Sequence, residues 1–235
     1  MTRRRWIADE FSADRAALTG EHAAHLARTL RARVGQEFEV ACGDQVRNAI
    51  VASVSDEHVE FTLGDEVAAH TVVPITLLLA VFKFDRMEWA IEKCTELNVT
   101  NIIPVIARRT EKHLALAAEK RVERWRRIAR EAAEQSRRIA PPEIADPVKF
   151  AQALNVTAAL RIVLAENERE ISLSEILRSR ESESLGLAVG PEGGWTEDEL
   201  RSFASSQWIA ASLGESILRA ETAAIAAMAI ARSEL

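Results

Sequence analysis

Two glycine-containing loops hold the residues whose types and spacing best fit a chemical role. The first loop follows the apolar run 187–189 and reads Gly190-Pro191-Glu192-Gly193-Gly194. Adjacent glycines let a backbone approach a ligand closely or adopt positive φ, and ligands of open α/β sheets bind at loops that follow strands. An ordinary glycine turn explains this loop equally well when it is considered alone. Its spacing matches neither a Walker A loop nor a dinucleotide fingerprint.

A second loop of the same kind follows the apolar run 208–213 and reads Gly214-Glu215-Ser216-Ile217-Leu218 before an alanine-rich helix. Two such loops after consecutive strands indicate one site built from adjacent strand ends. Arg219 can donate to a carbonyl oxygen or a phosphate, and Glu221 can accept a proton or orient Arg219. The alternative is an Arg–Glu pair that begins the last helix, where an acid also complements the helix dipole.

The elements around these loops indicate an α/β fold. Continuous apolar runs predict strands buried on both faces, at 75–81, 102–106, 160–165, 185–189 and 208–213. Helical periodicity predicts helices at 86–97 and 117–139, the second of them ended by Pro141-Pro142. Thr196 and Glu199 have the N-cap and capping-box spacing of a further helix. Alternating strands and helices predict a parallel sheet covered by helices.

The first 70 residues have a different pattern. Short runs with period-two alternation, at 38–41, 46–54 and 59–63, are separated by turn signals and predict a small β-barrel. One helix fits residues 20–31. We therefore expect two domains, at 1–70 and 71–235.

Charge is unevenly distributed along the chain. The net charge is −6, yet the strip 108–138 holds eleven Lys and Arg residues against five Asp and Glu, so the remainder carries −12. A basic strip on an acidic protein can bind RNA phosphates. A solvated helix face is the commoner meaning of a charge run, and composition alone favours it.

Composition excludes several classes of protein. The sequence has no apolar run of membrane-spanning length and no apolar signal segment after Met1. Cys42 and Cys94 form neither a CxxC motif nor a disulfide framework, which suits reduced, buried thiols in a cytoplasmic protein. No His/Cys cluster has metal-ligand spacing. We expect no metal and no membrane association.

Several segments carry a resemblance to a known family. The loops "VGPEGGW" and "LGESILRAETAA" resemble motifs of the ribosomal RNA small-subunit methyltransferase E family, as do "RMEWAIEKCTELNVTNIIPVIARRT", "RWRRIAREAAEQSRR" and "HLARTLR". These matches run from about His25 to the C-terminal helix. Members of this family methylate N3 of a uridine in 16S ribosomal RNA with S-adenosylmethionine, and they belong to the knotted SPOUT class.

The resemblance implies a PUA-like RNA-binding barrel at 1–70 and a SPOUT methyltransferase domain with a trefoil knot at 71–235. Periodicity alone predicts an ordinary open sheet, so the knot enters only through the resemblance. It also implies S-adenosylmethionine as cofactor, the small ribosomal subunit as partner, and an active site near a two-fold interface. The alanine-rich segment 222–231 fits a homodimer contact, although burial inside one monomer explains it equally well.

Site residues follow from the resemblance and from the charge pattern. The family's cofactor positions correspond to Gly190, Glu192, Gly193, Gly194, Leu213, Gly214, Ile217 and Leu218. The catalytic candidates are Arg219 and Glu221. The RNA-binding candidates come from a basic N-terminal arm, from one face of the predicted first helix, and from two positions at which the family commonly has Arg; they are Arg3 and Arg5, then His25, Arg28 and Arg31, and lastly Arg109 and Arg138.

Some residues depart from the family pattern. Phe84, Asn98 and Arg137 stand where the family usually has glycine, and Ser216 stands where it often has Arg. Two other functions therefore stay open. One is a SPOUT enzyme that acts on another base or on a ribose 2′-hydroxyl, and the other is a non-catalytic RNA-binding or ribosome-assembly protein.

Overall fold

A computed structural model describes residues 5–68, 72–179 and 182–235. The chain forms two compact units, the first from residues 1–71 and 130–141, the second from 72–129 and 142–235. The segment 130–141 therefore joins the first unit, although the division expected from the sequence assigns it to the second. The predicted α/β class is confirmed, with a mainly antiparallel N-terminal sheet and a parallel second sheet.

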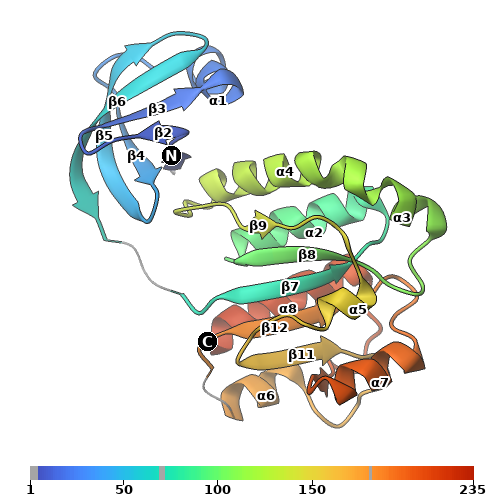
Figure 1. Ribbon diagram of the computed structural model, residues 1–235. Helices are drawn as coiled ribbons and strands as arrows, with labels where there is room; N and C mark the ends of the chain where they lie inside the picture. Colours follow the sequence, from blue (N-terminus) through green and yellow to red (C-terminus); the bar gives the residue numbers. More distant parts are fainter. Residues whose placement is uncertain (1–4, 69–71, 180–181) are drawn as a thin grey trace. The chain divides into compact units, whose positions relative to one another are not determined.

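The first unit is a curled, half-barrel sheet (Figure 1). Its strands, in the spatial order β1-β4-β5-β6-β3-β2, are Arg5–Ile7 (β1), Glu37–Cys42 (β4), Gln45–Val54 (β5), His58–Val67 (β6), Arg15–Thr19 (β3) and Glu10–Phe11 (β2). Among the described strands of this sheet, β1 and β4 pair in parallel and the other neighbours pair antiparallel. The apolar residues of the alternating runs predicted from the sequence point into the core of this unit. Trp6, Leu18 and Phe61 are among the side chains that form this core.

The helix predicted at 20–31 is not one continuous α-helix. Residues Gly20–Ala24 form α1, a π-helical turn covers His25–Thr29, and Arg31 has φ 52°. The Leu30 amide donates to the His25 carbonyl, an i to i+5 bond. Because a π turn is wider than an α turn, the spacing of His25, Arg28 and Arg31 no longer defines a single α-helical face.

The second unit holds a parallel sheet whose strands lie in the order β10-β8-β7-β12-β11-β13. The short strand β9 also pairs with β8. Its strands are Ile75–Ala80 (β7), Asn101–Ile106 (β8), Glu143–Ile144 (β9), Val148–Lys149 (β10), Leu160–Leu164 (β11), Leu185–Val189 (β12) and Ile209–Ala211 (β13). All five strands predicted for this region are present, with small differences at their ends. The short β9 and β10 were not predicted.

Helices cover both faces of this sheet (Figure 1). They are Phe84–Glu96 (α2), Lys112–Ala117 (α3), Val122–Gln135 (α4), Phe150–Ala153 (α5), Leu173–Ser179 (α6), Glu197–Ser205 (α7) and Ala220–Glu234 (α8), with a 3₁₀ turn at Ala118–Arg121. In β7, Leu77 and Leu79 pack in the cluster with α2 and α8, whereas Leu78 packs with α5 and α7. In the described ranges no helix is long and apolar enough to span a bilayer.

Two departures from the family pattern have a backbone explanation. The predicted helix 117–139 is divided by the 3₁₀ turn and ends at Gln135, before Pro141, and Arg137 follows with φ 62°. Asn98 follows α2 with the same φ of 62°. Both residues end a helix in the left-handed conformation that glycine adopts at no steric cost. Asn98 is a mild replacement because asparagine visits this region readily.

The end of α2 is also held by the last helix. The Arg232 guanidinium of α8 donates to the carbonyls of Val73 (2.6 Å), Leu97 (3.1 Å) and Asn98. Burial lowers the pKa of Arg232. A cation suits this position because the last carbonyls of a helix carry partial negative charge.

Ion pairs fix the segment 130–141 within the first unit. Glu39 accepts hydrogen bonds from Arg5 (2.8 Å) and from Arg137. Asp9 pairs with Arg130 at 2.8 Å and with His22 at 3.0 Å. Burial opposes ionisation of Glu39, yet the hydrogen bonds from Arg137 and Arg5 leave its pKa below the ordinary value. The carboxylate is therefore the stable form of Glu39 in the folded chain.

We predict that Glu39→Gln destabilises the first unit and weakens its acid sensitivity. Because the pKa of Glu39 is lower when folded, its stabilisation is present above the unfolded pKa and is lost as pH falls through the folded pKa. Charged hydrogen bonds contribute about 1.5–3 kcal/mol, so urea unfolding at pH 7 should show a loss of that size. The control is Glu60→Gln, whose more exposed pair with Arg15 should cost under about 1 kcal/mol. An acid-dependent loss of stability equal to that of the unaltered chain would contradict this role.

Candidate functional site

The three strands at one edge of the parallel sheet end at a common pocket. The neighbours β12, β11 and β13 run parallel, so their carboxyl ends lie together. The pocket has a volume of about 1260 Å³ and is lined by segments 164–175, 189–200 and 211–223, with Arg109 from the loop after β8. This is the position at which open α/β sheets bind ligands.

The loop after β12 has a backbone that only glycine fits closely. Gly194 has φ 66°, and its amide donates to the Pro191 carbonyl at 2.8 Å. A Cβ added at Gly190 would lie 3.3 Å from the backbone nitrogen of Trp195 and from its indole nitrogen. The Trp195 ring is itself fixed by packing against Phe150 and Phe203. The glycines therefore let the loop fold back on a rigid aromatic residue.

The predicted capping box at the start of α7 is confirmed. Thr196 Oγ1 accepts from the Glu199 amide at 3.3 Å, and Glu199 Oε2 accepts from the Thr196 amide at 2.8 Å. The other carboxylate oxygen of Glu199 accepts from the backbone amide of Arg108 at 2.7 Å. This buried side chain thus ties the loop after β8 to the loop after β12.

Arg109 extends from the loop after β8 to the first glycine loop. Its guanidinium donates to the carbonyls of Gly193 (2.5 Å) and Trp195 (3.3 Å). A Cβ at Gly193 would lie 3.2 Å from Arg109 Cδ, so the glycine leaves room for the arginine. Arg109, an RNA-binding candidate from the sequence, therefore supports the wall of the pocket.

The loop after β13 forms the opposite wall. Gly214 has φ 115°, and its amide donates to Ser212 Oγ at 3.0 Å. Ile217 is 84% exposed. Of the eight cofactor positions implied by the resemblance, seven line the pocket, namely Gly190, Glu192, Gly194, Leu213, Gly214, Ile217 and Leu218. The eighth, Gly193, contacts the pocket residue Arg109.

Sequence reasoning missed the third wall, the loop after β11. It includes Glu166, whose carboxylate lies 3.6 Å from the position of a Cβ on Gly194. Glu168 accepts from the amides of Glu170 (2.8 Å) and Ile171 (3.1 Å), and these bonds lower its pKa. This loop has no glycine signature. Only the order of the strands, with β11 between β12 and β13, reveals that it belongs to the site.

The pocket is strongly acidic. Its lining includes two arginines, Arg109 and Arg169, and seven glutamates at positions 166, 168, 170, 175, 192, 197 and 215. A concave site of one charge sign attracts ligands of the opposite sign. The pocket therefore favours a cationic ligand and disfavours a phosphate group.

The two catalytic candidates lie at the start of α8, in different environments. Arg219 is the N-cap residue and is exposed, and its side chain has no hydrogen bond or ion pair within the described chain. Glu221 is 4% exposed, with Oε1 3.6 Å from Arg86 Nη1 of α2. Its Oε2 has no hydrogen-bond partner among the described residues. Arg86 was not selected from the sequence, because nothing there places α2 beside α8.

The other RNA-binding candidates are all in the first unit. Arg5 is largely buried and bonded to Glu39, Arg28 pairs with Asp56 at 2.9 Å, and Arg31 is exposed. The His25 ring lies 6.0 Å from the ring of Trp6. Arg138 also has interactions within the protein. Arg3 lies outside the described residues.

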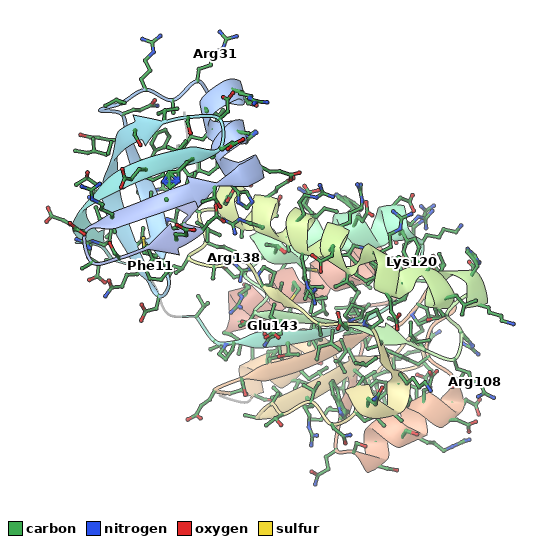
Figure 2. All side chains as sticks on the ribbon, turned by 45° about the horizontal axis from the view of Figure 1, so that its top comes forward. Phe11, Arg31, Arg108, Lys120, Arg138 and Glu143 are labelled. Atoms are coloured by element: carbon green, nitrogen blue, oxygen red, sulfur yellow. The ribbon has the colours of Figure 1, made fainter. Side chains whose placement is uncertain are left out.

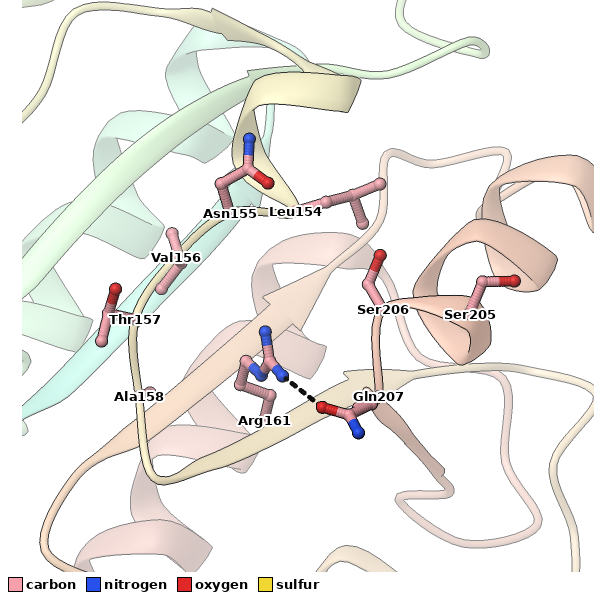
Figure 3. A pocket seen from close by; sticks show the side chains of 9 residues that line it. All are labelled: Leu154, Asn155, Val156, Thr157, Ala158, Arg161, Ser205, Ser206 and Gln207. Atoms are coloured by element: carbon pink, nitrogen blue, oxygen red, sulfur yellow. Dashed lines mark hydrogen bonds between the residues drawn. The ribbon is translucent and has the colours of Figure 1, made fainter.

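A second pocket, of about 540 Å³, lies at the amino ends of β11 and β13 (Figure 3). Its lining comes from residues 154–158, Arg161 and residues 205–207. Arg161 donates to Gln207 Oε1 at 3.5 Å, and no acidic or histidine side chain is among the residues that line it. This pocket lies at the strand ends opposite to those where such sheets bind ligands.

The two cysteines are free and buried, as predicted. Burial raises the pKa of Cys94 to about 12 and also raises that of Cys42. Both thiols therefore stay protonated at neutral pH. Across the described residues, no group of three or more His, Cys, Asp and Glu side chains could hold a metal ion.

Comparisons with known proteins agree with this geometry. Residues 69–232 match the model of an RNA methyltransferase domain. The chain is 33% identical to ribosomal RNA small subunit methyltransferase E of Rickettsia conorii, covering 92% of this chain and 88% of that protein. It is 34% identical to the Bacillus subtilis protein of the same name, covering 90% and 87%.

Solved structures share the whole architecture. Ribosomal RNA small subunit methyltransferase E of Neisseria gonorrhoeae, bound to S-adenosyl methionine, has a TM-score of 0.87 and 28% identity, covering 98% of this chain and 97% of that one. A Legionella pneumophila methyltransferase in complex with the same cofactor has a TM-score of 0.86 and 26% identity, covering 99% and 98%. With its glycine loops at the ends of β12 and β13, the parallel strands on either side of β11, the chain belongs to the ribosomal RNA small subunit methyltransferase E family.

Proposed function

We propose that this protein transfers the methyl group of S-adenosylmethionine to N3 of a uridine in 16S ribosomal RNA. The observation that carries the proposal is the pocket formed by the two glycine loops at the carboxyl ends of β12 and β13. Relatives with the same architecture are bound to this cofactor. Mass spectrometry of nucleosides from 16S RNA incubated with protein and cofactor tests it. 3-Methyluridine is expected, whereas a methylated ribose or another base would indicate a different SPOUT activity.

The described residues fit the proposed cofactor. Gly190 leaves room for Trp195 beneath the loop, Gly194 supplies its positive φ, and Glu192 and Glu166 add negative charge to the pocket. When bound, S-adenosylmethionine supplies an activated methyl group on a cationic sulfonium. The acidic pocket complements that cation. The residues that would hold the cofactor are those of the two glycine loops, with the loop after β11 as an additional wall.

The reaction sets a second requirement, because N3 of uracil carries a proton and is a poor nucleophile when neutral. Arg219 is exposed and has no partner among the described residues, so it can donate to a uracil carbonyl oxygen or to a phosphate and stabilise the developing imide anion. Glu221 Oε2 has no hydrogen-bond partner in the described part of the chain and can accept a proton. The target base must also be unstacked before its Watson–Crick edge can react.

The PUA-like character of the first unit and the trefoil knot of the second stay predictions from the family resemblance. The same holds for RNA binding by Arg5, His25, Arg28, Arg31 and Arg138, and for the cytoplasmic location. For Arg5 the hydrogen bonds to Glu39 and to the Arg137 carbonyl already use much of the guanidinium. Exposed Arg31 is the freer of the two to meet RNA.

We predict that Gly193→Val weakens binding of S-adenosylhomocysteine by about tenfold or more while the fold survives. The added side chain displaces Arg109 from the Gly193 and Trp195 carbonyls and narrows the approach to the loop, at a cost of about 1–3 kcal/mol. Calorimetric titration measures the affinity. Arg109→Ala is the control, because it removes the arginine and keeps the glycine. Unchanged affinity in folded Gly193→Val protein would remove this loop from the site.

We predict that Arg219→Ala lowers single-turnover methyl transfer by about 100-fold, because one preorganised donor is lost. Affinity for S-adenosylhomocysteine should stay within a few fold. Arg219→Lys should recover little if a bidentate contact is needed. Arg178→Ala removes the same charge from an exposed residue paired with Glu234 and should leave the rate unchanged. Near-normal turnover of Arg219→Ala would show that Arg219 only begins α8 and takes no part in methyl transfer.

We predict a homodimer in solution. Ala224, Ala227 and Met228 of α8 are already buried within one chain, so these residues are not available for a dimer contact. Ile217 beside the pocket and Trp89 on α2 remain 84% and 48% exposed. Apolar side chains left exposed beside a site fit a protein interface. Light scattering at micromolar concentration decides the question, and a strict 26.0 kDa monomer would defeat the prediction.

A further inference from the structure

The basic strip 108–138 separates into paired and unpaired cations once the chain is folded. Eight of its eleven Lys and Arg residues interact with other groups of the protein. Arg109 holds backbone carbonyls of the first glycine loop, Arg121 and Arg124 face Glu88, and the others with partners are Arg126, Arg127, Arg130, Arg137 and Arg138. These arginines fix the protein's own structure, so the strip as a whole is not a free surface.

Three cations of the strip have no partner in the part of the chain that the structure describes. The side chains of Arg108, Lys112 and Lys120 are exposed and have no hydrogen bond or ion pair within the described residues. All three lie between the end of β8 at Ile106 and the start of α4 at Val122. Figure 2 labels Arg108 and Lys120 in this part of the second unit. We call these three residues the α3 cations.

The α3 cations begin at the margin of the pocket. The backbone amide of Arg108 bonds to Glu199 of α7, and the next residue, Arg109, lines the pocket itself. Two glutamates share the segment, but Glu111 faces His113 at 3.5 Å, and five basic residues from Arg108 to Arg121 outnumber them. A basic surface therefore adjoins a pocket whose own lining is acidic.

This opposition of charge restricts how an RNA can approach. Seven glutamates in the pocket disfavour a phosphate there, so only a base can enter without electrostatic cost. The phosphates on either side of that base need cations outside the pocket. Phosphate contacts of this kind position a nucleic acid without reading its sequence.

We propose that the α3 cations bind backbone phosphates of the RNA next to the nucleotide that enters the pocket. The inference rests on the proposed function for its substrate class. It assigns the RNA contact to residues of the basic strip that were not among the RNA-binding candidates named from the sequence. Long, solvated Lys and Arg side chains suit this task because they can follow a flexible strand. Each phosphate they neutralise releases counterions, so the contribution is measured by salt dependence.

The test is the salt dependence of binding to 16S RNA made by transcription. The variant Arg108→Gln/Lys112→Gln/Lys120→Gln should bind about 10- to 100-fold more weakly at moderate salt, with the slope of log affinity against log salt reduced by about 2–3. The matched control is Arg15→Gln/Arg178→Gln/Arg201→Gln. It loses the same charge from exposed arginines that are paired with Glu60, Glu234 and Asp198. Its slope should stay close to that of the unaltered protein.

Kinetics separate this role from catalysis. The α3 variant should raise KM for RNA and leave both kcat at saturating RNA and affinity for S-adenosylhomocysteine unchanged. Equal slopes and equal affinities for the two triple variants would overturn the proposal. Failure of the proposed function is recognised differently, because the unaltered protein would then neither bind the cofactor nor methylate the RNA.

Discussion

The parallel pairing of β12, β11 and β13 is the constraint on which the site depends. Hydrogen bonds between these neighbours align their carboxyl ends, and three loops that are distant in sequence become three walls of one pocket. Each loop is then held by a separate device. Arg109 and the capping box at Thr196 fix the loop after β12. In the loop after β13, the Ser212 hydroxyl accepts a hydrogen bond from the Gly214 amide. In the loop after β11, the Glu168 carboxylate accepts a hydrogen bond from the Glu170 amide.

The pocket and the surface beside it carry opposite charge, so they suit different ligands. The pocket concentrates glutamates, which suits a cationic sulfonium, while exposed cations begin at its margin with Arg108. A protein with net charge −6 can therefore bind a polyanion locally, because charges separated by more than about 8 Å are largely screened at physiological salt. Most arginines of the basic strip serve another purpose. Arg130 and Arg137, for example, neutralise Asp9 and Glu39 within the first unit.

Positions that differ from the family pattern illustrate how the backbone limits substitution. Asn98 and Arg137 both have φ 62°, where glycine is the unstrained choice. The Arg137 guanidinium donates to Glu39, and the Asn98 carbonyl accepts from Arg232. Phe84 fills space instead, with its ring 6.0 Å from that of Trp125 and under the guanidinium of Arg121 at 4.9 Å. Phe84, Asn98 and Arg137 therefore each have a local structural partner, whereas nothing in the structure explains Ser216.

The sequence by itself determined the longer elements of the second unit and the two glycine loops, because apolar runs, glycines and capping residues act through neighbours in the chain. It determined the strands from Ile75 to Ala211, the capping box at Glu199 and the buried cysteines. Only the tertiary structure decided the order of the strands, and with it the third wall at Glu166. It also decided which cations are paired, the π turn at His25, and the contact of Arg86 with Glu221. These depend on groups distant in sequence, whose meeting no local pattern encodes.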